Sequence, residues 1–147
     1  DVSFGNADTG TAQGFYISCR ASNGKIRAIF NTSGGLVSGL TDSSAVFCDG
    51  LDHVMTVAFD AVTKQAFIWR DGFLSDAYTA TGITGTSTPS VPFFLGGGVS
   101  LAGIAAQFSG VHLLKFTGGL PLNINKVVAK LASRPFEFLT NLDVQIG

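Results

Sequence analysis

The sequence predicts an all-β protein, an antiparallel β-sandwich of short strands with one short helix near residues 123–132. Three observations carry this prediction. Glycine, asparagine and aspartate punctuate the chain at short intervals, as turns between strands do. The apolar residues between these turns come in short runs, far below the roughly 20 residues that a membrane-spanning helix needs. One segment departs from the pattern, because its apolar residues recur at helical spacing.

The apolar runs predict strands at residues 15–20, 25–30, 45–48, 53–59, 66–70, 91–95, 107–116 and 142–146. In the clearest of them, 53–59, the odd-numbered positions hold His, Met, Val and Phe and the even-numbered positions hold Val, Thr and Ala. Apolar residues at both sets of positions predict a strand that is covered on both faces. Residues 60–64 then turn the chain, so that 66–70 returns as the second arm of a hairpin.

The predicted helix interrupts the strand pattern near the end of the chain. Four apolar residues recur there at helical spacing, namely Ile124, Val127, Val128 and Leu131. Asn123 can act as the N-cap, and Pro121 and Pro135 bracket the segment. Residues 79–90 are instead rich in Thr, Gly and Ser, which predicts a long exposed loop.

The bulk properties fit one domain, and we expect residues 1–147 to form it, because 147 residues can bury a core without help from metals. The net charge is −1 and the basic residues are scattered singly, which argues against nucleic acid as a partner. Only 13% of the residues are charged and 46% are hydrophobic. Some apolar surface should therefore remain for contact with other subunits, in a homo-oligomer or a larger particle.

The beginning of the chain and its cysteines leave alternatives open. The chain starts at Asp1 without a methionine or a signal-peptide pattern, so we expect a processed product or a piece of something longer. Cys19 and Cys48 both lie in predicted strands, where a disulfide can join neighbouring strands, but two small buried thiols are the more common case. Neither histidine lies at ligand spacing from them, so no zinc site is expected.

Four motifs in the second half of the chain occur in a specific order. Residues 52–60 read Asp-His-Val-Met-Thr-Val-Ala-Phe-Asp, residues 68–72 read Ile-Trp-Arg-Asp-Gly, residues 94–97 read Phe-Leu-Gly-Gly, and residues 108–110 read Phe-Ser-Gly ahead of the helix. Together they resemble the laminin-G-like and pentraxin-like branch of the concanavalin A-like lectin and glucanase superfamily. The resemblance implies a jelly-roll sandwich. Arg70 departs from it, because the family usually has a buried aliphatic residue there.

No catalytic site is expected. Glucan-cleaving members of that superfamily share a Glu-x-Asp-x-x-Glu strand, because a retaining glycosidase needs two carboxyl groups about 5 Å apart. This chain has a single glutamate, Glu137, so that pattern is missing. A serine or cysteine nucleophile would need His53 or His112 as its base, and we expect both histidines to be structural.

Two candidate binding sites follow. Trp69, Arg70, Asp76 and Tyr78 are the best set for a glycan, since exposed aromatic rings and polar neighbours recognise sugars. The alternative places Trp69 in the hydrophobic core. The resemblance also implies calcium at the rim of the sandwich, for which Asp49 and Asp52 are the candidate ligands, and turn-forming aspartates are the alternative.

The function that we expect is a non-catalytic recognition or attachment module, of tail-fibre or capsid-decoration type, at an extracellular or virion surface. Its ligand would be a glycan or a surface protein. Low charge and many apolar residues suit a second reading equally well, a structural decoration or cement protein that stabilises a viral particle through subunit contacts. A third is a calcium-dependent lectin domain of a secreted protein. No membrane insertion is expected.

Overall fold

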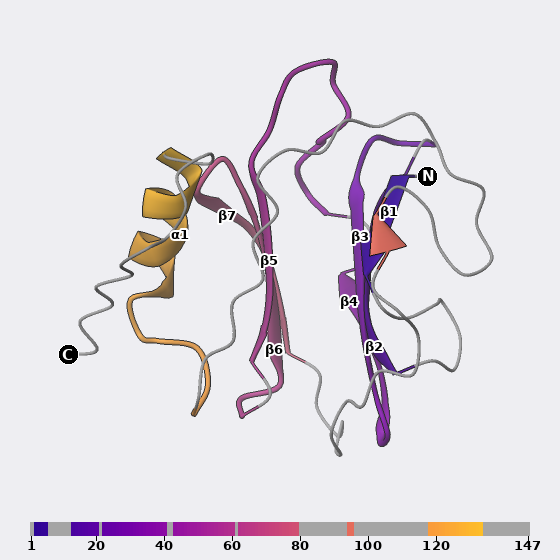
Figure 1. Cartoon of the computed structure of the whole chain (residues 1–147), viewed down its shortest axis with the longest axis vertical. Coiled ribbons are helices and arrows are strands. Elements are labelled where there is room, and N and C mark those ends of the chain that lie inside the picture. The colour runs from indigo at the N-terminus through magenta and orange to yellow at the C-terminus, as the bar shows by residue number, and fades with distance from the viewer. Residues whose placement is uncertain are drawn as a thin grey trace.

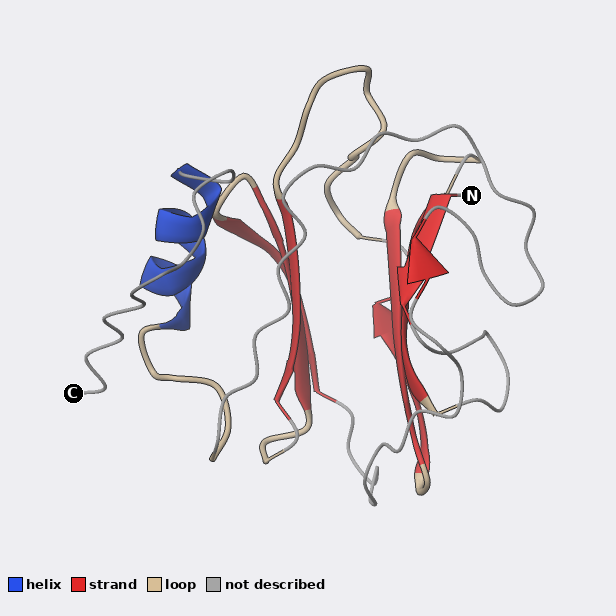
Figure 2. Ribbon diagram, in the orientation of Figure 1, coloured by secondary structure: helices blue, strands red, loops and turns tan. Residues whose placement is uncertain are grey.

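The computed structural model describes residues 2–5, 13–20, 22–40, 43–60, 62–79, 94–95 and 118–133. These residues form a β-rich fold of two antiparallel sheets and one short helix (Figure 2). The elements are β1 Val2–Gly5, β2 Gly14–Cys19, β3 Ile26–Thr32, β4 Gly35–Leu40, β5 Met55–Asp60, β6 Gln65–Arg70, β7 Phe73–Thr79, β8 Phe94–Leu95 and α1 Ile124–Ser133. No helix in these ranges has the length and apolar content to cross a membrane.

The two sheets and the helix form successive layers (Figure 1). One sheet has the strand order β4-β3-β2-β1-β8 and the other has the order β5-β6-β7. The main apolar cluster draws buried residues from both sheets and from the segment after β4, namely Ile17, Ile26, Ala28, Phe47, Ala66 and Ile68. The three-stranded sheet lies between the five-stranded sheet and α1, so that it has a neighbour on each face.

The predicted hairpin at residues 53–70 is confirmed. Its arms are β5 and β6, which pair with Phe59 opposite Ala66 and Asp60 opposite Gln65. β5 is half-buried at both odd and even positions before Asp60, in keeping with a strand covered on both faces. The buried Asp60 closes the turn, because its Oδ1 accepts the N–H of Val62 at 2.8 Å.

The helix is confirmed to within one residue of its predicted ends. The Asn123 carbonyl accepts the N–H groups of Lys126 and Val127, which starts the first turn. Val127 and Val128 are buried. The hairpin between β6 and β7 meets α1 closely, since a Cβ added to Gly72 would lie 3.1 Å from the Cα of Ala129.

Other strands differ from the prediction. Residues 45–48 form no strand, and the only ladder contact there is an isolated bridge between Lys25 and Val46. β1, β4 and β7 were not predicted, because their sequences alternate weakly and β4 contains two of the glycines that read as turns. Of the predicted strand 91–95 the structure describes only β8. The predicted strands 107–116 and 142–146, and residues 80–90 of the predicted loop, lie outside the described residues.

Candidate functional site

Trp69 lies in the hydrophobic core, as the alternative to a glycan-binding role predicted. Its side chain is 1% exposed, and its indole N–H donates to Asn125 Oδ1 of α1 at 2.8 Å. Its ring lies 5.4 Å from that of Phe67, two residues earlier on the same face of β6. The Trp69 ring therefore fills the layer between the sheet and the helix and offers no face to a sugar at the surface.

The other three predicted glycan residues lie on the opposite face of the three-stranded sheet. Successive residues of a strand point to opposite faces, so Arg70 faces away from Trp69. Asp76 pairs with Ile68 and Tyr78 with Ala66, both of which belong to the cluster between the sheets. The structure thus separates Trp69 from the rest of the predicted set.

Asp76 already has partners within the chain. Its carboxylate accepts the backbone N–H of Ser44 at 2.9 Å and 3.0 Å and the Ser44 hydroxyl at 2.6 Å, and it also bonds the Ser75 hydroxyl. Burial raises the pKa of Asp76, but these hydrogen bonds outweigh the effect and the pKa is lowered. Asp76 therefore anchors the segment that follows β4.

A polar cluster that sequence analysis did not assemble lies at the end of β6, at Arg70. His53 is 9% exposed, and its Nε2 and Nδ1 each lie 2.9 Å from a carboxylate, of Asp49 and Asp71 respectively. Arg70 Nη2 lies 2.7 Å from Asp49 Oδ2. The Asp71 Oδ1 accepts the Val54 N–H, and the Asp71 N–H donates to the Val54 carbonyl. One basic ring and one guanidinium thus join two carboxylates.

The Asp71-Gly72 turn positions this cluster. Both residues have positive φ, 52° and 85°, and they form a two-residue loop between Arg70 and Phe73. Such a loop is the type I′ hairpin turn that Asp-Gly favours, because both central residues must adopt left-handed backbone angles. The turn directs the Asp71 carboxylate back to His53.

His53 can be satisfied in two protonation states. In the protonated ring both N–H groups donate, one to Asp49 and one to Asp71. In the neutral ring Nδ1–H donates to Asp71, while Nε2 accepts from Arg70 Nη2, which lies 2.7 Å away. Burial lowers the pKa of His53, but the hydrogen bonds to Asp49 and Asp71 outweigh burial and raise it above 6.5.

The pKa values of the two carboxylates, Asp49 and Asp71, shift in the opposite direction from that of His53. The hydrogen bond from His53, followed by the Leu51 N–H, lowers the pKa of Asp49 to about 2. Burial raises the pKa of Asp71, but the Val54 N–H and His53 outweigh burial and lower it. Both carboxylates therefore stay charged beside Arg70 over the ordinary pH range.

Stability should depend on pH through this cluster. Because the pKa of His53 is raised by folding, His53 adds to the free energy of unfolding at a pH below its unfolded-state pKa. This contribution is lost as the pH rises through its folded-state pKa. Folding lowers the pKa values of Asp49 and Asp71, so the two carboxylates add to the free energy of unfolding at a pH above their unfolded-state pKa. This contribution is lost as the pH falls through their folded-state pKa, which is about 2 for Asp49. The combined contribution should peak between about pH 4 and 6.5.

The variant His53→Gln tests this dependence. We expect its thermal midpoint to fall below that of the natural chain by more at pH 5.5 than at pH 8.5, since only the natural chain gains from protonation. Asp52→Asn is the matched control, because Asp52 is exposed and its side chain makes no hydrogen bond with the described residues. A difference in thermal midpoint that grows toward alkaline pH would contradict the raised pKa of His53.

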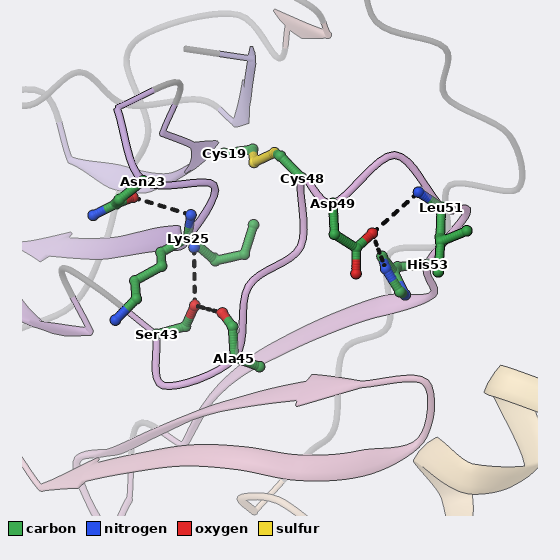
Figure 3. The surroundings of a disulfide bond; sticks show 10 residues. Cys19, Asn23, Lys25, Ser43, Ala45, Cys48, Asp49, Leu51 and His53 are labelled. Atoms are coloured by element: carbon green, nitrogen blue, oxygen red, sulfur yellow. Dashed lines mark hydrogen bonds and ion pairs between the residues drawn. A yellow bond between two sulfur atoms is a disulfide. The ribbon is translucent and has the colours of Figure 1, made fainter.

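Cys19 and Cys48 form a disulfide, not the two buried thiols of the more common alternative (Figure 3). The bond joins the end of β2 to the segment at residues 43–54. The same segment is held by Ser43, whose hydroxyl accepts the Ile26 N–H and donates to the Ala45 carbonyl. The segment therefore links the five-stranded sheet, through Cys48, to the polar cluster on the three-stranded sheet.

One of the two predicted calcium ligands already has partners within the chain. Asp49 is paired with His53 and Arg70, and the Arg70 guanidinium repels a cation. Asp52, the other predicted ligand, is exposed. Within the described parts of the chain, no three His, Cys, Asp or Glu side chains are arranged to hold a metal ion. Calcium binding stays a prediction.

Part of the cluster was visible in the sequence. The resemblance placed Arg70 where an aliphatic residue is usual, and a charged residue on the inner face of a strand needs partners. His53 was expected to be held by hydrogen bonds near the core, as it is.

Glu137 and His112 lie outside the described residues. No family model matches the chain, and no curated protein or solved structure matches it significantly.

Proposed function

We propose that this chain is a non-catalytic module of an extracellular or virion surface assembly, which works through protein contacts at its surface. The observation that carries the proposal is the exposure of large apolar side chains. Phe73 is 79% exposed, Leu51 71%, Val62 67% and Leu122 100%. Exposed apolar surface commonly marks contact with other proteins, because its burial is favourable.

The fold within this proposal is a concanavalin A-like jelly-roll sandwich. Two antiparallel sheets that share an apolar cluster support it, as does the hairpin with its Asp-Gly turn. The disulfide between Cys19 and Cys48 supports an extracellular setting, because disulfides persist in oxidising compartments.

A recognition module and a cement protein differ in the kind of partner that they bind. A recognition or attachment module binds a foreign surface protein or glycan, whereas a decoration or cement protein binds its own neighbours. The buried Trp69 ring weakens the glycan reading, since the sole tryptophan is unavailable for stacking. Protein contact through the exposed apolar residues therefore has the better support, and the calcium-dependent lectin has the least.

Three measurements test the proposal. Light scattering should show concentration-dependent association, or affinity capture from the native assembly should retain a specific partner protein that a heat-unfolded sample does not retain. A glycan array should stay silent, with and without added calcium. A monomer that captures no protein but binds a glycan in calcium would support the lectin alternative, and cleavage of a polysaccharide would overturn the non-catalytic assignment.

A further inference from the structure

The disulfide between Cys19 and Cys48 has two unequal ends. Cys48 is exposed, whereas Cys19 is half-buried at the end of β2, where it packs against the main apolar cluster. Cys19 is also held within the five-stranded sheet, because it pairs with Val2 of β1 and with Ile26 of β3. The two ends of the bond therefore differ in how easily a molecule from the solvent can approach them.

The surroundings of Cys48 leave it open to the solvent. Residues 49–52, which follow it, are all exposed. Gly24 lies next to Cys48 and has no side chain to cover it, since a Cβ added to Gly24 would lie 3.4 Å from the Cys48 Cβ. The adjacent Asp49 carboxylate is paired with the Arg70 guanidinium, so its charge is compensated where an anion approaches Cys48.

We propose that Cys48 is a modification site, at which small thiols exchange with the disulfide. Exposed disulfides are the ones that thiols open most readily, and access decides which of the two sulfur atoms an incoming thiolate attacks. Cys48 offers the exposed sulfur, whereas the packing around Cys19 restricts approach to the other one. The inference goes beyond the proposed function, which stands or falls by its own tests.

The exchange needs no reagent other than the thiol. The attacking thiolate sulfur bonds to the Cys48 sulfur and is oxidised, while the bond between the two cysteines breaks. The Cys19 sulfur is reduced and leaves as a thiolate, which takes up the proton that the thiol lost. The product has a mixed disulfide at Cys48 and a thiol at Cys19, so the covalent tie between β2 and the segment at residues 43–54 is open.

Glutathione is the probe that tests this site in the natural chain. The folded chain is incubated with glutathione, the exchange is stopped with acid, and mass spectrometry after non-reducing digestion with pepsin locates the adduct. We expect about tenfold more adduct on Cys48 than on Cys19, because access limits the attack on Cys19. The chain unfolded in urea is the matched control, and it should carry the adduct on both cysteines to a similar extent. Equal adducts in the folded chain, an excess on Cys19, or no adduct before unfolding would each overturn the inference.

Two single variants provide an independent measurement. Cys19→Ser leaves the Cys48 thiol and Cys48→Ser leaves the Cys19 thiol, and the two are matched because each lacks the disulfide. With an aromatic disulfide reagent, the Cys48 thiol should react about tenfold faster than the Cys19 thiol in chains that circular dichroism shows to be folded. In urea the two rates should become similar. Equal rates in the folded variants would overturn the preference for Cys48, and the proposed function would be unaffected.

Discussion

Replacing Trp69 with alanine is expected to lower the free energy of unfolding by about 3–5 kcal/mol, the usual cost of removing a large buried ring. The side chain is 1% exposed, and it fills the layer between β6 and α1. Small domains unfold with about 5–15 kcal/mol, so the variant should lose a large share of its stability. Urea unfolding followed by circular dichroism measures the change, because the variant has no tryptophan left to report by fluorescence.

Two further variants separate packing from hydrogen bonding. Trp69→Phe keeps most of the ring packing and should cost less than Trp69→Ala. Asn125→Ala removes only the acceptor of the indole N–H and should cost about 1–3 kcal/mol, the price of an unsatisfied buried donor. If Trp69→Ala instead unfolded at the same urea concentration as the natural chain, the ring would lie at the surface and glycan stacking would regain support.

Removing the disulfide is expected to cost about 3–4 kcal/mol in the variant Cys19→Ser/Cys48→Ser. The bond closes a loop with a sequence separation of 29, and the chain-entropy estimate for such a loop gives this magnitude. The loss should exceed that of an ordinary surface substitution, because the bond also fixes the segment that carries Asp49. Urea unfolding under non-reducing conditions measures it.

Reduction of the natural chain provides the control for this variant. A reducing agent should lower the stability of the natural chain to that of the double variant and leave the double variant unchanged. Thiol titration of the unfolded natural chain should find no free thiol before reduction and two afterwards. Two free thiols in freshly prepared natural chain, together with equal stability of the double variant, would restore the alternative of two unlinked cysteines.

The elements that sequence reasoning located share a strong local signal. The hairpin of β5 and β6 has two apolar runs joined by a polar turn, and α1 has apolar residues at helical spacing. β7 has a weak pattern of its own, and it forms because every residue of β6 pairs with it, with one register shift between Ile68 and Trp69. Residues 45–48 show the reverse case. Their apolar run was read as a strand, yet their backbone bonds mainly to the Gly24 carbonyl, since the segment crosses between the sheets.

The candidate site was likewise predictable only in part from the sequence. Each member was visible singly, with Asp71 in a turn dipeptide, His53 beside a strand and Arg70 at an unusual position. Their convergence was not visible, because 17 residues separate His53 from Arg70 and only the β5–β6 pairing brings the two together. The glycan set loses Trp69 for a related reason, since adjacent residues on one strand point to opposite faces.

By itself the sequence determined a β-rich chain with one helix near its end, little charge and one glutamate, because local periodicity and composition set these properties. Only the tertiary structure decided that Trp69 is buried, that Cys19 meets Cys48, and that His53 lies between two carboxylates. Contacts between residues distant in sequence depend on strand register and layer order, and neither is encoded in any single local segment.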